Sequence, residues 1–439
     1  MQAIRNAESS NPTLPCPDLS TLMPGDGTDW QALHSQLEPL LPRCLRSSDY
    51  FALLGAAQMN TGRLSEALES LERALLIEPR NGGAQIDYAE ALYRQGQLFS
   101  ALELNQQIMQ RDDVPEHLAG LLSQRQQVWR GMTRQWGYQA DILTGYDNNL
   151  NGAPSPSQIT LTLSGENVVL PLNPDFQSVE GPFMNLRLGA RYRQLAPAHQ
   201  HNVLVELRGR VSEDTSSDLL QLDTRYAFIK PGQNRSWQAT AGMSHLFFGG
   251  SPLYTATEAG GQYQFEQSWL DTNSSSCRPF ATAAAQHQFF HDQSNLNALE
   301  SKLGGGLNCQ INTGFGRQLL MPSLSVLHNS ALRNGSNARA GGSRSGWQAS
   351  LDWQLELPKG ILITQLNHTR MDDHKGYSPL LAGGAKRWIK RSYALIQYRQ
   401  PLGPQTNLML NLYHQTQHSN LELFRSRDSS AEIGININF

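Results

Sequence analysis

Histidines are the side chains best placed for metal or acid–base chemistry in this sequence. His287 and His291 lie four residues apart, so they would share one face of a regular strand, where two imidazoles could bind a metal ion. The alternative, which we favour, is two polar residues near the loop end of a strand. His199 and His201 are expected in a solvated turn, and no Gly-x-Ser-x-Gly motif presents a nucleophilic serine. We therefore expect no metal, no cofactor and no enzymatic activity.

Composition excludes two further classes of protein. The 439 residues have a formal net charge of −3 and 17% charged residues, so no nucleic-acid partner is expected. No apolar run reaches the roughly 18 residues that a transmembrane helix needs.

The start of the chain, MQAIRNAESSNPTLPC, has no basic-then-apolar leader, so we expect that a leader was removed or that the start is misassigned. Cys16 follows Leu14 and Pro15 rather than a small residue, so no lipid attachment is expected there.

Residues 29–134 have the spacing of a helical repeat, after an irregular segment at residues 1–28. A 34-residue period matches tetratricopeptide positions, and the second unit is the more degenerate of the two. The first unit comprises Phe51, Leu54, Gly55, Gln58, Gly62, Leu64, Ala67, Leu71, Ala74 and Pro79. The second comprises Gln85, Tyr88, Ala89, Leu92, Gly96, Leu98, Ala101, Asn105, Ile108 and Asp113. Residues 30–46 and 116–134 are predicted to be flanking helices that cover the ends of the stack.

The first helix of each repeat is where a peptide would bind. The predicted groove residues are Met59, Asn60, Glu90, Tyr93 and Arg94. The alternative is a helical array without a ligand, and the sequence leaves both open.

From residue 135 to residue 439 the apolar period changes to two, the spacing of β-strands. The segments are about ten residues long, which suits a tilted strand that crosses a bilayer. Fourteen are predicted, at 136–146, 183–193, 202–213, 218–228, 236–248, 254–269, 280–290, 298–312, 317–327, 347–357, 361–370, 389–399, 406–417 and 428–439. The expected fold is an α+β two-domain chain, in which a short α-helical tetratricopeptide-like array precedes a 14-stranded antiparallel transmembrane β-barrel.

The connections between the segments predict where each end of the barrel lies. Long loops at 147–182, 328–346 and 371–388 follow odd-numbered strands, whereas tight links such as TGFG and PKG follow even-numbered ones. Outer-membrane barrels have long loops outside and short turns in the periplasm. We therefore predict a bacterial outer-membrane protein in contact with outer-membrane lipid, with its helical domain in the periplasm.

Charged side chains indicate which strand face points into the barrel. An arginine that faced lipid near the midplane would cost roughly 2–4 kcal/mol, so the charged face should turn inward. The predicted lumen wall is Arg187, Arg191, Arg193, Glu206, Arg208, Arg210, Asp223 and Arg225. Two interpretations are open: the wall guides a substrate, or its ion pairs simply fill the lumen. Segments 361–370 and 389–399 alternate poorly, so their register is not assigned.

The last residues of the chain combine a glycine, an apolar residue and a terminal aromatic. Glu432, Gly434, Ile437 and Phe439 resemble the signal that the barrel-assembly machinery recognises in its clients. That machinery is therefore an expected partner.

Two of the four cysteines are predicted to pair. Cys277 is expected in the turn between the sixth and seventh strands, and Cys309 near the end of the eighth, so both belong at the periplasmic rim. An oxidising compartment favours a Cys277–Cys309 disulfide. The alternative is two free thiols, and the pairing of Cys16 with Cys44 is left open.

The combination of repeat helices with a fourteen-strand barrel resembles the surface lipoprotein assembly modifier family. Two stretches carry the resemblance: GYDNNLNGAPS at residues 145–155 and SNLELFRSR at residues 419–427. The resemblance implies a factor that delivers lipoproteins or related secreted proteins to the cell surface, with such a client as its partner. The alternatives are a polysaccharide- or solute-export porin with a periplasmic scaffold domain and, least favoured, an outer-membrane enzyme.

Overall fold

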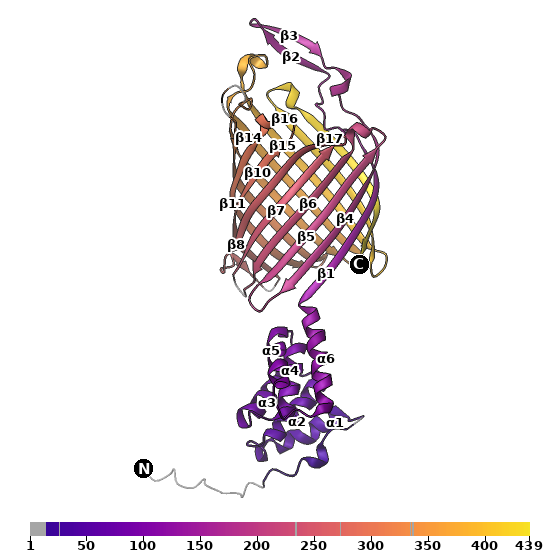
Figure 1. The fold of residues 1–439 in the computed structure, drawn as a ribbon, viewed down its shortest axis with the longest axis vertical. Helices are drawn as coiled ribbons and strands as arrows, with labels where there is room; N and C mark the ends of the chain where they lie inside the picture. Colours follow the sequence, from indigo (N-terminus) through magenta and orange to yellow (C-terminus); the bar gives the residue numbers. More distant parts are fainter. Residues whose placement is uncertain (1–14, 26, 233–234, 273, 334, 336–337) are drawn as a thin grey trace, which may run out of the picture. The chain divides into compact units, whose positions relative to one another are not determined.

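The computed structural model describes residues 15–25, 27–232, 235–272, 274–333, 335 and 338–439. The chain divides into two compact units, residues 1–134 and residues 135–439 (Figure 1). In the described part of the chain, no helix is both long enough and apolar enough to span a membrane.

Six α-helices form the first unit, and capping side chains determine where several of them begin. The side chains of Asp29, Ser47 and Asn81 each accept a hydrogen bond from a backbone N–H in the first turn of the helix that follows. Two helical hairpins correspond to the two predicted repeats, and one helix flanks each side. The helices are α1 (Trp30–Leu37), α2 (Ser48–Asn60), α3 (Leu64–Ile77), α4 (Gly82–Arg94), α5 (Leu98–Met109) and α6 (Glu116–Met132).

Small residues let the paired helices approach closely. A side chain at Gly55 would overlap Leu71, so glycine is required where α2 crosses α3. The Tyr50 hydroxyl donates to the Leu37 carbonyl at 3.0 Å and joins α2 to α1. In the second repeat, Asn105 replaces the apolar residue of the first and is completely buried. The degenerate position is therefore part of the packed core.

Among the described residues, fourteen antiparallel strands of the second unit close into a barrel, because β10 pairs with β11 and β17 pairs with β1. The barrel strands are β1 (Arg134–Asp147), β4 (Gly181–Leu195), β5 (Gln200–Ser212), β6 (Leu219–Lys230), β7 (Ser236–Phe248), β8 (Ser251–Gln264), β10 (Ser275–Phe290), β11 (Ala298–Thr313), β12 (Gly316–Ala331), β13 (Arg344–Leu357), β14 (Gly360–Gly376), β15 (Lys386–Pro401), β16 (Thr406–Ser419) and β17 (Ser426–Asn438). The predicted fold class and strand count are confirmed.

Three local predictions were wrong. The long first loop contains a separate hairpin, β2 (Gln158–Leu163) and β3 (Glu166–Pro171). The sixth strand ends at Gln264, and the chain pairs again only at β9 (Leu270–Asp271). The seventh strand begins at Ser275, so Cys277 lies inside a strand and not in a turn. The strands also extend further toward the long loops than apolar alternation shows, because their outer ends are polar.

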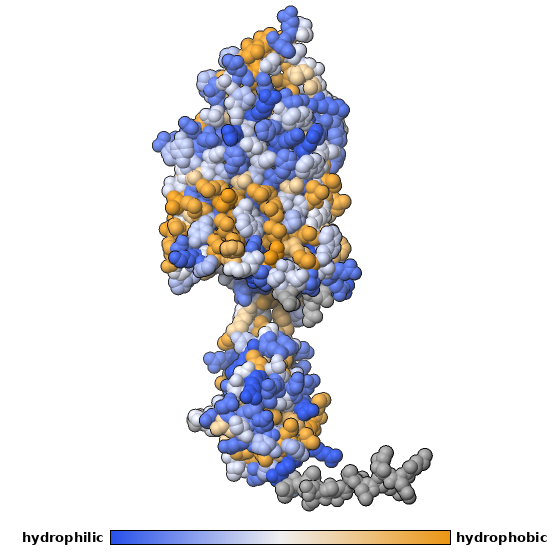
Figure 2. All heavy atoms as spheres, turned by 180° about the vertical axis from the view of Figure 1, so that it is seen from behind, coloured by the Kyte–Doolittle hydropathy of each residue, from blue (hydrophilic) through white to orange (hydrophobic). Residues whose placement is uncertain are grey.

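The two faces of the barrel wall differ in polarity. Met184, Leu186 and Leu188 point outward and are exposed, whereas Asp141 points inward and is completely buried. Figure 2 shows the apolar residues gathered in a band nearer the tight-turn end, with a hydrophilic surface toward the long loops. The register left open for β14 and β15 is now assigned: Leu366 lies opposite Ala394, and both point outward.

Candidate functional site

The predicted lumen wall is a set of paired charges on neighbouring strands. Arg187 donates from Nε to Asp141 at 2.6 Å, and Arg210 lies 3.5 Å from Asp147. Arg208 contacts Glu206 and lies 4.0 Å from Asp223, while Arg225 lies 3.5 Å from Glu258. Arg193 donates to Gln200 at 3.1 Å; in the described part of the chain neither Arg193 nor Arg191 has a carboxylate partner.

Pairing does not remove these charges from the solvent. The side chains of Arg208 and Arg225 are 52% and 60% exposed, and they line a cavity of about 320 Å³ together with Glu206, Asp223 and Glu258. Exposed ion pairs contribute little to stability. This part of the wall therefore remains available to a passing polar molecule, whereas the Arg187–Asp141 pair is structural.

The buried Asp141 is the centre of a polar network at the seam between β1 and β17. It accepts hydrogen bonds from Gln139, Arg187 and Asn436, so its oxygens have partners on three strands. A buried carboxylate is stable only when it is paired in this way. The network joins the first and last strands inside the barrel.

Glu432 and Gly434, two residues of the predicted assembly signal, belong to the same seam. Glu432 accepts from Asn185 on β4 and from Asn411 on β16, so its carboxylate spans β1 at Gly145. A side chain at Gly145 would meet Phe183 and Glu432, and one at Gly434 would meet the backbone of Leu143. Both glycines are therefore needed where the barrel closes.

The other two residues of the predicted signal face outward or end the chain. Ile437 lies opposite Ala140 on β1 and Thr406 on β16. Phe439 is 65% exposed, and its backbone N–H donates to the Tyr138 carbonyl at 2.9 Å. Recognition of these residues by an assembly machinery stays a prediction.

The two stretches that carry the family resemblance meet at the long-loop end of this seam. Asn149 donates from Nδ2 to the Arg427 carbonyl at 3.1 Å, and the Ser429 N–H donates to the Asn148 side chain at 2.9 Å. The Ser155 N–H donates to the Arg425 carbonyl at 2.8 Å. Residues 145–155 and 419–427 thus form one structure, which we call the seam cap.

The β2–β3 hairpin is attached beside the seam cap by the edge of β2. The Thr160 N–H donates to the Glu422 carboxylate at 2.9 Å, and the Thr162 N–H donates to the Leu380 carbonyl at 2.8 Å. Sequence analysis missed this hairpin because it treated the whole of 147–182 as a loop. The signal in the sequence was the alternating segment QITLTL followed by the turn-forming pair Ser164–Gly165. Both residues of this pair have positive φ in the structure.

The five predicted groove residues do not form one open surface. Met59 is buried in the first helical core, because α2 packs its last turn against the neighbouring helices. Asn60 donates only within its own helix, to the Ala56 carbonyl. Glu90 and Arg94 pair with each other at 2.9 Å. These side chains therefore lie at separate places on the helical array and do not line one continuous groove.

Tyr93, the fifth groove residue, leads to a cluster that sequence analysis missed. Its ring stacks on Trp129 with centroids 4.9 Å apart, and the Arg125 guanidinium lies 4.7 Å from the centroid of the same Trp129 ring. Burial raises the pKa of the nearby Asp87 to about 6, although Arg125 opposes the shift. The spacing of Arg125 and Trp129, one helical turn apart, was a usable signal.

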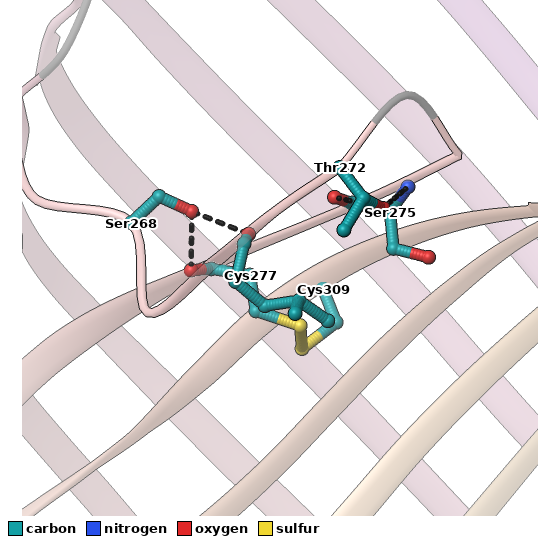
Figure 3. The surroundings of a disulfide bond; sticks show 6 residues. Ser268, Thr272, Ser275, Cys277 and Cys309 are labelled. Atoms are coloured by element: carbon teal, nitrogen blue, oxygen red, sulfur yellow. Dashed lines mark hydrogen bonds between the residues drawn. A yellow bond between two sulfur atoms is a disulfide. The ribbon is translucent and has the colours of Figure 1, made fainter.

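Both cysteine pairs are disulfides in the structure. Cys277 lies directly opposite Cys309 across β10 and β11, and Figure 3 shows Ser268 beside the bond, donating to the Cys277 carbonyl. Ser268 also donates to the Leu270 carbonyl. Cys16 is bonded to Cys44, which anchors the segment before α1.

Of the two histidines singled out for metal binding, His287 lies inside β10 and His291 follows the end of that strand. Nε2 of His291 lies 3.0 Å from the Thr255 hydroxyl, which also bonds Nδ1 of His245 at 2.7 Å. His201 bonds the Tyr226 hydroxyl, and His199 stacks on Phe228. Within the residues that the structure describes, no three metal-ligating side chains come together.

Comparison with known proteins identifies the repeat. A family model for the tetratricopeptide repeat matches residues 59–124. No curated protein sequence matches the chain.

Solved structures resemble parts of the chain at low identity. The type III secretion translocator chaperone SycD of Yersinia enterocolitica is 20% identical over 24% of this chain and 73% of its own, with a TM-score of 0.22. An anion-selective porin from Comamonas acidovorans is 12% identical over 70% of this chain and 99% of its own, with a TM-score of 0.35. A bacterial polysaccharide outer membrane secretin is 8% identical over 68% and 98%, with a TM-score of 0.33. The chain itself combines tetratricopeptide-repeat helices with a closed fourteen-strand barrel.

Proposed function

We propose that this chain is a bacterial outer-membrane factor for transport or assembly rather than an enzyme, and that it delivers lipoproteins or related secreted proteins to the cell surface. The observation that carries the proposal is where the repeat helices are attached. They continue directly into β1, which begins beside the end of β17 and the β15–β16 turn. In outer-membrane barrels such tight turns lie in the periplasm. A client-binding unit would then be tethered on the side where clients arrive.

The barrel supports a membrane location on physical grounds. A closed barrel leaves no unpaired strand edge, which is the condition for strands to lie in lipid. The outward apolar residues and the inward charges meet the second condition, since a charge on the lipid side is costly. The terminal residues Glu432, Gly434, Ile437 and Phe439 would serve as the signal for barrel assembly.

The repeat unit supports a protein client. Stacked helical repeats bind extended peptides on the face that their first helices form. Here α4 carries Tyr93, the Glu90–Arg94 pair and the partly buried Asp87, and Arg125 of α6 lies near Asp87. Aromatic and charged groups together suit a polypeptide with polar side chains.

A second candidate function, export of a polysaccharide or solute, is favoured by the exposed charges of the lumen. Arg225 and Glu258 line the lumen cavity, and such a polar surface suits a hydrophilic solute. In that case the repeat helices would serve as a scaffold.

The test compares the full chain with a variant that lacks residues 1–130, both exported with the same leader. Each is expressed with a candidate client lipoprotein, and intact cells are treated with protease. We expect the deletion variant to form a heat-modifiable barrel. We also expect the client to become protected from protease in cells that express this variant, because it is no longer delivered to the surface. Unchanged client digestion would show that the helices are not the receptor. Protection of the client even with the full chain, together with ion conductance of the purified barrel, would favour solute export.

A further inference from the structure

A groove of about 420 Å³ lies on the outward face of β13–β16. Small side chains create it, since Ala349, Ser392 and Ala394 stand where neighbouring positions carry larger groups such as Leu366. Its surface is mainly apolar. In a membrane protein, an outward groove of this kind is filled by lipid.

The groove changes from apolar to polar along the strands. One row across the strands consists of Leu351, Leu366, Ala394 and His414, and the next consists of Ala349, His368, Ser392 and Thr416. The row after that consists of Trp347, Arg370, Lys390 and His418. An acyl chain in the groove would thus lead to a headgroup beside cationic side chains.

The cationic row lies at the depth where headgroups begin. β14 leaves a tight turn at Gly360, and Arg370 lies ten residues further along the strand. At about 3.3 Å per residue and a tilt of about 40°, this is roughly 25 Å from the turn end. The apolar band of such barrels is also roughly 25 Å tall. The row therefore marks the outer-leaflet edge of the band.

Basic side chains occur at this depth only beside the groove. Among the described strands, outward-facing lysine and arginine in the half toward the long loops occur on β14, β15 and β17 alone; they include Arg370, Lys390 and Arg427. Arg370 is held by Asp372 at 3.0 Å. Over the part of the chain that is described, no carboxylate lies within 4.0 Å of Lys390 or Arg427. The Lys390 ammonium lies 5.3 Å from the centroid of the Trp388 ring, a contact that does not neutralise its charge, so both side chains can bind an anion.

Two histidines, His368 and His414, lie in the two rows that precede the cationic row. Nδ1 of His368 lies 2.7 Å from the Ser392 hydroxyl, and Nδ1 of His414 lies 2.7 Å from that of Ser429. These hydroxyls orient the rings, and Nε2 of each ring has no partner among the described residues.

We propose that this groove binds one phosphorylated glycolipid of the outer leaflet, with an acyl chain against Ala394 and Leu366 and its phosphate on Lys390 and Arg427. The acyl chain matches the apolar rows, and the phosphate matches the cluster of outward cations that the described strands carry at this depth. The inference rests on the membrane placement of the barrel and not on client delivery.

The test measures binding of bisphosphorylated lipid A to the purified full chain in non-ionic detergent by native mass spectrometry. The variant Lys390→Gln/Arg427→Gln should weaken binding about 25-fold, which is fivefold or about 1 kcal/mol for each charge. Ala394→Leu fills the groove and should weaken it without any change of charge. Lys230→Gln at the opposite rim and the outward Ala259→Leu on β8 are the matched controls. Heat-modifiable migration verifies that each variant is folded.

Dephosphorylated lipid A and a triacylated lipopeptide without phosphate distinguish the possible occupants. We expect both to bind at least tenfold more weakly than bisphosphorylated lipid A. Equal affinity for the groove variants and the controls would overturn the proposal. Tight binding of the lipopeptide that is unaffected by Lys390→Gln/Arg427→Gln would also overturn it, because the groove would then hold an acylated client. Client display in cells is a separate readout, so failure of the proposed function is distinguishable from failure of this inference.

Discussion

Replacing Asn105 by alanine should destabilise the helical unit more than any exposed substitution in it. Asn105 is completely buried between α5 and α6. Its side chain donates to the Leu122 carbonyl at 3.1 Å and to Gln126 at 2.7 Å, and it accepts from both Nε and Nη2 of Arg125. Alanine removes these hydrogen bonds and leaves their three partners in place.

The hydrogen bonds lost to Leu122, Gln126 and Arg125 set the magnitude. A hydrogen bond to a charged group is worth roughly 1.5–3 kcal/mol and a neutral one roughly 1 kcal/mol. Arg125 regains part of this by turning toward solvent or toward Asp87. The free energy of unfolding of the helical unit should therefore fall by about 3–4 kcal/mol. At about 4 °C per kcal/mol for a unit of this size, its Tm should fall by roughly 12–16 °C.

The measurement is thermal loss of helical far-UV ellipticity in the full chain in detergent, where the barrel stays folded. Asn60→Ala is the matched control, because Asn60 is exposed and bonds only within its own helix. It should lower the Tm by no more than roughly 2 °C. The reasoning is refuted if Asn105→Ala and Asn60→Ala melt together. The double variant Asn105→Leu/Arg125→Leu should recover part of the loss, because it removes the orphaned guanidinium as well.

Three further outcomes are expected. Burial raises the pKa of Asp87 to about 6, so the folded unit holds this proton more tightly than the unfolded chain and loses stability as pH rises from about 4 to about 6. Asp87→Asn should abolish this fall, which is at most roughly 3 kcal/mol, in urea titrations. Gly434→Ala should lower the yield of heat-modifiable barrel, because the added methyl group would meet the β1 backbone. Phe439→Ala should lower the same yield, because it removes the terminal aromatic residue of the assembly signal. A wild-type yield of either variant would contradict the prediction for that variant. Thiol labelling without reductant should leave Cys277 and Cys309 unmodified, and labelling of both would disprove the bond.

The barrel was predictable because lipid and lumen impose opposite demands on alternate residues. All fourteen segments were found from this alternation, and β7 (Ser236–Phe248) has the predicted limits. The outer ends of β12 and β14 were missed because both of their faces are polar there. Cys277 was placed in a turn because SSSCRP has no apolar alternation, although it pairs with β11.

The candidate binding face was predicted less well, since repeat spacing does not show which helix covers which. Met59 occupies a groove position in the repeat, yet the packing of the first hairpin buries it. Trp129 and Arg125 lie in a flanking helix outside the repeat pattern, and only the packing of α6 on α4 brings them to Tyr93. Long-range pairing of this kind is decided by the fold as a whole.

The seam cap has a consequence for how slowly the barrel comes apart. Asn149 and Arg427 are 278 residues apart in sequence, so their hydrogen bond forms only after both ends of the sheet have met. Contacts absent from the folding transition state act on the unfolding rate and leave the folding rate almost unchanged. We therefore expect the seam cap to slow the separation of β1 from β17, and so the unfolding of the barrel, while the folding rate stays almost unchanged.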